Sequence, residues 1–269
     1  GTFITRSGVI SSVHSFTQSS IGPMFLIFIG LSATFAFALL GSKVHLLRTP
    51  ARIEAVVSRE STFLLNNVIF LGACFAVFWG TMFPIISEAV RGVKITVGPP
   101  FFDAVNVPIA LALLFLTGVG PLVAWRKTSL ASLKKIFAIP VIGMIVAAAI
   151  FLAFGIRHVY ALMSFSLGVF VTLTIVSEFH RGALARQHSN NEAYPIAWWH
   201  LLLKNKQRYG GYIVHFGMVM IFMGITGSAF NKEAEGRLKR GESFSLRNYE
   251  MVYENFRHLR DANKTVDEA

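Results

Sequence analysis

Charged side chains are scarce in this chain of 269 residues. They make up 14% of the sequence, whereas hydrophobic residues make up 54% and the mean hydropathy is +0.56. Soluble domains carry about 25% charged residues. The composition therefore excludes an ordinary soluble domain and predicts an integral membrane protein. A net charge of +11 in such a chain is typical of basic loops at the negative inner membrane surface, so we expect the lipid bilayer and no nucleic acid as a partner.

Cysteine and the usual catalytic motifs are also almost absent. Cys74, the single cysteine, excludes an internal disulfide and any metal site built on a cysteine pair. The chain has no His-Glu-x-x-His motif and no glycine-rich phosphate loop after a strand. Hydrolytic zinc chemistry and nucleotide binding thus have no support, and we assign no catalytic residue. The chain begins Gly-Thr-Phe and ends in a charged stretch, so we expect it to be a segment of a longer protein.

Long apolar runs are what the sequence has in abundance. Six are long enough to cross a bilayer: 21–40, 63–86, 107–124, 137–154, 159–176 and 212–230. Residues 155–158 join the fourth and fifth runs so closely that we expect a tight helical hairpin. The predicted fold class is an all-α polytopic membrane protein of about six transmembrane helices.

The loops between these runs alternate in charge. The first, third and fifth loops are basic, whereas in the second loop Arg91 and Lys94 are balanced by Glu88 and Asp103. The positive-inside rule places the basic loops in the cytoplasm and both ends of the chain on the outer side. We expect residues 1–230 to form the membrane domain and residues 231–269 to begin an outer soluble segment, with a weak strand pattern around Phe244 and Leu246.

His215 is the one ionisable residue between Tyr212 and Phe230. An imidazole at bilayer depth is costly unless it has a partner, so it predicts a functional site. Gly211, His215 and Met218 share one helical face, where a flat macrocycle such as haem would fit with the imidazole as axial ligand. Gly217 and Gly224 lie roughly opposite and would let a neighbouring helix approach closely. The alternative is a histidine hydrogen-bonded to a serine or threonine of another helix.

A second histidine, His14, precedes the first apolar run by seven residues. Arg6 lies near it at the membrane interface, and a guanidinium binds carboxylates through a planar fork, so a haem propionate would suit it. The alternative is an ordinary interfacial amphipathic stretch.

Several other residues carry local predictions. Ser58 and Glu60 indicate a helix start, and Glu178 is spaced to pair with Arg181. Residues 97–100 are expected to form an outer turn. Trp125 and Tyr209 are expected to anchor the chain at the membrane interface. Trp198 and Trp199 are expected either to form another anchor or to belong to an amphipathic stretch on the inner surface.

Six segments together resemble the CcmF family of cytochrome c biogenesis proteins, the large haem-lyase subunits of bacteria and plant mitochondria. They occur in the family's order: GTFITRSGVISSVHSF (1–16), SRESTFLLNN (58–67), GTMFP (80–84), VGPPFF (97–102), GVGPLVAWR (118–126) and RYGGYIVHFG (208–217). Each is a weak match alone, whereas the ordered set is specific.

The resemblance implies roles for both histidines. His14 would be an axial ligand to the haem being delivered, and His215 would ligate a resident haem b that supports reduction and transfer of the incoming haem. The implied partners are the haem chaperone CcmE, CcmH/CcmI-type subunits and apocytochrome c, in the bacterial inner membrane or the mitochondrial inner membrane. The family's tryptophan-rich segment and the second ligand of each haem are expected outside these 269 residues.

The depth of His215 separates the two expected haem sites. His215 lies about six residues, or about 9 Å, from the inner start near Tyr209 and about fourteen residues, or about 21 Å, from the outer end, at 1.5 Å per residue. We therefore expect reductant to enter from within the membrane, as a quinol. A paralogue dedicated to a multihaem nitrite reductase, a transporter of haem or another small molecule, and a membrane scaffold without haem remain as alternatives.

Overall fold

A computed structural model describes most of the chain. The described residues are 21–47, 58–123, 129–231, 239–246, 249–254, 257–261 and 264–268. Within them, six helical segments are long and apolar enough to cross a membrane, which confirms the predicted all-α polytopic class. The predictions for His14, Arg6 and Trp125 lie outside the described residues.

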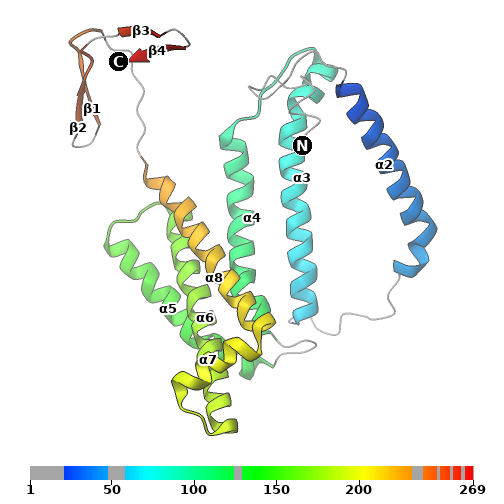
Figure 1. Ribbon diagram of the computed structural model, residues 1–269, viewed down its shortest axis with the longest axis vertical. Helices are drawn as coiled ribbons and strands as arrows, with labels where there is room; N and C mark the ends of the chain where they lie inside the picture. Colours follow the sequence, from blue (N-terminus) through cyan, green and yellow to red (C-terminus); the bar gives the residue numbers. More distant parts are fainter. Residues whose placement is uncertain are drawn as a thin grey trace.

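Figure 1 labels the helices in their order along the chain. They are α2 (Ile21–Lys43), η1 (Val44–Leu47), α3 (Arg59–Arg91), α4 (Pro99–Val119), η2 (Gly120–Leu122), α5 (Leu130–Ala153), α6 (Val159–Asn190), α7 (Tyr194–Lys204), α8 (Lys206–Gly227) and η3 (Ser228–Phe230). Figure 1 shows α2 apart from the other helices, and no residue of its apolar span is buried.

Helix α3 extends beyond the apolar run from which it was predicted. Its two ends are set by capping residues and not by the first and last apolar residues. The Ser58 hydroxyl accepts a hydrogen bond from the Ser61 N–H at 3.1 Å and closes the amino end, as expected for that residue. Gly92 has φ of 68° and donates its N–H to the Glu88 carbonyl, which ends the helix.

Helix α4 corrects the prediction of an outer turn at residues 97–100. Gly98 is the N-cap, and Pro99 and Pro100 already form the first helical turn. Proline lacks only an N–H that is unpaired in a first turn, and its fixed φ suits the helix, so the Pro-Pro pair begins α4.

The hairpin between α5 and α6 is as tight as predicted. Helix α5 ends at Ala153 and α6 begins at Val159, with Gly155 at φ of 88° in the turn between them. His158 caps α6, since its Nδ1 accepts a hydrogen bond from the Ala161 N–H at 3.3 Å.

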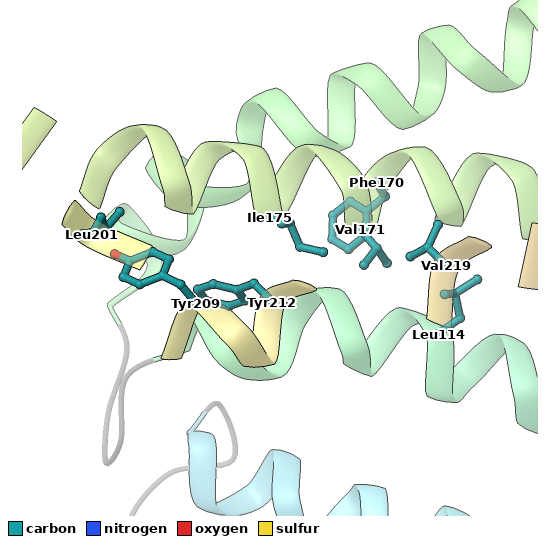
Figure 2. Close-up of a cluster of buried hydrophobic side chains, with 8 residues drawn as sticks. All are labelled: Leu114, Phe170, Val171, Ile175, Leu201, Tyr209, Tyr212 and Val219. Atoms are coloured by element: carbon teal, nitrogen blue, oxygen red, sulfur yellow. The ribbon is translucent and has the colours of Figure 1, made fainter. Parts of the chain in front are cut away.

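Helix α6 is the centre of the bundle and packs against α4, α5, α7 and α8. Figure 2 shows its buried side chains Phe170, Val171 and Ile175 between residues of α4, α7 and α8. The Phe170 ring stacks with Phe115 and Phe137, at centroid distances of 5.9 and 6.0 Å. These contacts fix the position of α8 relative to α4 and α6.

The predicted glycine stripe on α8 is wrong as a helix contact. A Cβ at Gly217 or Gly224 would meet nothing within 4 Å among the described residues. The face of α8 that packs on α6 instead carries Val219 and Met223, and Gly168 of α6 provides the room, because a Cβ there would lie 3.0 Å from the Met223 sulfur.

Polar side chains also join these two helices. The hydroxyls of Ser164 on α6 and Thr226 on α8 lie 2.6 Å apart within the bundle. Such pairs hold helices together in a medium that offers no water.

The tail forms two antiparallel hairpins, beyond η3 in Figure 1. Strands β1 (Ser243–Leu246) and β2 (Tyr249–Val252) pair in the first, and β3 (Arg257–Asp261) and β4 (Lys264–Glu268) pair in the second. The strand predicted around Phe244 and Leu246 is therefore confirmed.

Candidate functional site

His215 faces a small cavity of mixed polar and apolar lining between α3, α4 and α8. This small cavity has a volume of about 300 Å³. Besides His215, its lining residues are Arg59, Thr62, Phe63, Asn66, Leu116, Thr117, Gly120 and Pro121. An apolar helix thus presents its one imidazole to a cavity that also holds polar side chains.

The imidazole is not satisfied by the protein around it. Nδ1 of His215 is buried and has no hydrogen-bond partner among the described residues. Thr62 and Thr117 line the same cavity, yet neither bonds this nitrogen. The alternative of a histidine hydrogen-bonded through Nδ1 to a neighbouring threonine is therefore not what the structure has.

A second, larger cavity adjoins the imidazole toward the Lys206 end of α8. This large cavity has a volume of about 630 Å³. Besides His215, its lining residues are Arg59, Pro121, Leu122, Val123, Gln207, Arg208, Gly211 and Tyr212. His215 and Arg59 line both cavities, so the space around the imidazole extends from α4 to the first turns of α8.

A buried acid beside the large cavity holds α8 against α6. Glu178 of α6 is 7% exposed, and its Oε2 accepts hydrogen bonds from Arg208 at 2.7 Å and from the Tyr212 hydroxyl at 3.2 Å. Its Oε1 pairs with Arg181, as the spacing predicted. The acid is therefore a latch between α6 and the helix that carries His215.

Tyr209 corrects another prediction. It was expected at the membrane interface, but it is 4% exposed and packs on Phe179 with ring centroids 5.0 Å apart. Helix α7 explains this burial, because Leu201 of α7 packs in the same buried cluster as Tyr209. Trp198 and Trp199 lie on α7 and remain largely exposed.

An apolar cavity lies on the other side of Tyr212, between α6, α7 and α8. Its volume is about 570 Å³, and Phe179, Trp198 and Phe216 are among its lining residues. One polar pair lines it, because His180 Nδ1 and the Tyr194 hydroxyl are 2.9 Å apart. Tyr212 lines both this apolar cavity and the large cavity, so this residue of α8 borders both spaces.

Sequence reasoning found part of this site. Gly211 and His215 line one cavity, as their shared face predicted, whereas Met218 lines neither cavity next to His215 and is 42% exposed. The residues it did not assign to the site are Arg59, Asn66, Glu178, Arg208 and Tyr212. The sequence did hold one signal for Arg59. It is a charged residue at the start of a predicted span that also holds asparagines.

The depth of His215 also changes. Helix α8 begins at Lys206, three residues before Tyr209, and continues to Gly227. At 1.5 Å per residue His215 then lies about 14 Å from one end and about 18 Å from the other. It is still closer to the end predicted to be cytoplasmic, but nearer the middle of the helix than expected.

These features define a polytopic helical membrane protein in which one imidazole lines two adjoining cavities. Three relatives match nearly the whole chain. CycK of Rhizobium meliloti is 32% identical over 99% of this chain and 39% of its own length. CcmF of Pseudomonas aeruginosa is 29% identical over 99% of this chain and 40% of its own length, and CcmF of Escherichia coli is 25% identical over 98% and 39%.

The chain belongs to the CcmF/CycK family of cytochrome c-type biogenesis proteins, which confirms the resemblance. It spans about two fifths of the length of the curated relatives it matches. No family model matches the chain, and no solved structure matches it.

Proposed function

We propose that this chain is the haem-handling membrane part of a haem lyase for cytochrome c maturation. The CcmF and CycK relatives support a role in cytochrome c-type biogenesis. The observation that carries the haem assignment is that the His215 imidazole lines two adjoining cavities, while its Nδ1 has no hydrogen-bond partner among the described residues. An imidazole is a common axial ligand of haem iron, and the open space beside it would admit the macrocycle.

The residues of this chain fit such a group. His215 would supply one axial ligand, and Gly211 would leave room for the macrocycle one turn away. When bound, haem b supplies a one-electron redox centre within the membrane. The described residues that line the two cavities include no second histidine. The resemblance implies a second ligand outside this chain.

On the outer side, His14 would be an axial ligand to the haem in transit, with Arg6 on a propionate. CcmE would deliver that haem, and CcmH/CcmI-type subunits would present apocytochrome c. The chain as a whole would lie in the bacterial inner membrane, or the mitochondrial one, with both ends on the periplasmic side.

A quinol is the expected source of electrons. The apolar cavity supports this expectation, since an apolar ring with a small polar edge matches its lining and its single His180–Tyr194 pair. A quinol releases two electrons and two protons when it becomes a quinone. The electrons would leave one at a time in two successive one-electron reductions of the resident haem, His180 would accept one proton from a ring hydroxyl, and the other proton would pass to water, because His180 is exposed. Tyr212 would separate the quinol from the space next to His215.

Cytochrome c maturation in cells tests the proposal. His215→Ala and His14→Ala in the whole protein should each abolish covalent haem attachment, read by haem staining of c-type cytochromes. His188→Ala is the matched control, because His188 is exposed and lines none of the three cavities. Normal maturation in His215→Ala would contradict the proposal.

A further inference from the structure

The short helix α7 has an apolar face that the described bundle does not cover. Its inner face carries Ala197 and Leu201, which are both buried. Ile196, Trp199 and Leu203 follow at helical spacing on another face, and all three are exposed. Such a face is unfavourable in water and suits the boundary between lipid headgroups and acyl chains, where tryptophan is also favoured.

The contacts of α7 place it at the depth where α6 leaves the membrane. A bilayer core of about 30 Å takes about 20 helical residues, so α6, which begins at Val159, crosses it by about Phe179. Trp198 stacks on Phe179 with ring centroids 5.7 Å apart, and the Tyr194 hydroxyl lies 2.9 Å from His180 Nδ1. Helix α7 therefore lies beside the edge of the hydrocarbon layer, at the lower end of the bundle in Figure 1.

The junction between α7 and α8 is basic. Lys204 ends α7 and Lys206 begins α8, and both side chains are exposed. They border a cavity of about 370 Å³, and the described residues that line it include no acid. Neither lysine forms an ion pair with a described residue. Two positive charges thus lie next to the apolar face of α7.

The nearby acids do not neutralise these lysines. Glu178 pairs with Arg208, with 2.7 Å between its Oε2 and the guanidinium. Glu192, in the turn before α7, is bound by Arg186 through two hydrogen bonds of 2.9 and 3.0 Å. Each of these carboxylates therefore already has an arginine as its partner.

We propose that α7 and its junction with α8 bind acidic phospholipids of the inner leaflet. Lys204 and Lys206 meet the headgroup, and the face of Ile196, Trp199 and Leu203 packs on the acyl chains. An acidic phospholipid joins a negative charge to an apolar body at this depth, whereas an acidic protein segment matches the lysines alone. The inner leaflet follows from the orientation that the basic loops predict. The proposal does not depend on haem.

Quenching of Trp199 by brominated phospholipids tests the proposal. The whole protein is placed in bilayer nanodiscs of phosphatidylglycerol and phosphatidylcholine, and one lipid or the other carries bromine on its acyl chains at equal mole fraction. The fluorescence lost in Trp199→Phe isolates the signal of Trp199 from that of the other tryptophans. The relative affinity for phosphatidylglycerol at Trp199 should be at least about fivefold, since one lysine at an anionic surface contributes about 1 kcal/mol, a factor of about five.

The variants are Lys204→Gln and Lys206→Gln. Each should lower the preference for phosphatidylglycerol by at least about twofold, and the two together should bring the relative affinity close to one. Lys43→Gln is the matched control for the single variants. Lys43 is an exposed lysine at the end of α2, at the same predicted cytoplasmic side, and Figure 1 shows α2 apart from the other helices. It should keep the full preference.

Three results would overturn the proposal. The first is equal quenching by the two brominated lipids in the unmodified protein, and the second is an equal loss of preference in Lys43→Gln. The third is no quenching of Trp199 by either lipid, which is also the result expected if an acidic protein segment covers this face. His215→Ala should be quenched like the unmodified protein, so the lipid site and the haem assignment are tested separately.

Discussion

The Tyr212 hydroxyl donates a hydrogen bond to Oε2 of Glu178 at 3.2 Å, from a position three residues before His215 on α8. The same oxygen accepts from Arg208, so one buried acid of α6 holds two side chains of α8. The rotation of α8, and hence the direction in which His215 faces, is fixed at this latch.

Glu178→Gln should weaken the bundle, because it removes the charge from hydrogen bonds to Arg208, Arg181 and Tyr212. We expect a loss of about 1–3 kcal/mol, seen as a lower Tm of the protein in detergent. Glu88→Gln is the control, since Glu88 is exposed near the carboxyl end of α3. Equal Tm values for the two variants would mean that the latch contributes nothing.

The fold class could be predicted from composition because a membrane span has to be long and apolar whatever it packs against. Helix ends were less predictable, since α3 and α4 end and begin at Ser58, Gly92 and Pro99, where local caps and not hydropathy decide. His215 and Gly211 could be assigned to one site because they share one helix.

The rest of the candidate site could not be predicted for a different physical reason. Glu178 and Arg208 are 30 residues apart, and Arg59 is on another helix altogether. Their meeting depends on how α3, α4 and α6 pack, which side-chain shape determines. The error over Gly217 has the same origin, because a glycine stripe shows where a helix can approach and not where one does.

Gly118→Ala should be destabilising. A Cβ at Gly118 would lie 2.8 Å from the ring of Phe170, and Phe170 is 2% exposed among packed neighbours that leave it no room. Overpacking of this kind costs about 1–3 kcal/mol. Thermal unfolding in detergent measures it.

Gly217→Ala is the matched control on another helix. No described residue lies within 4 Å of a Cβ there, so we expect a gain in helix propensity of up to about 1 kcal/mol. If Gly118→Ala is as stable as Gly217→Ala, the close approach of α4 and α6 is incorrect.

The turn between α6 and α7 should be sensitive to acid. Arg186 binds Glu192 through two hydrogen bonds, of 2.9 and 3.0 Å, and this pairing lowers the pKa of Glu192 below its ordinary value of 4.5. The stabilisation is present above that ordinary value and is lost as the pH falls through the lower folded-state pKa.

The comparison is between the unmodified protein and Glu192→Gln. At pH 6 the unmodified protein should have the higher Tm, and the difference should shrink as the pH is lowered toward 3. A difference that stays constant over this range would show that the ion pair is not its source.

Reduction by a quinol should depend on the apolar cavity. His180→Ala removes the group proposed to accept a proton and should slow reduction of the resident haem by a quinol analogue by about 10²-fold. The haem spectrum itself should be unchanged, because His180 does not line either cavity next to His215. His188→Ala should reduce at the normal rate, and equal rates for both variants would remove quinol binding from this cavity.

The absorption spectrum of the whole protein, purified from membranes, tests haem ligation by His215 most directly. His215→Ala should lose the Soret band of the resident haem, whereas His188→Ala, prepared in the same way and equally well folded, should keep it. An unchanged Soret band in His215→Ala, with the same intensity per protein as in His188→Ala, would contradict the account.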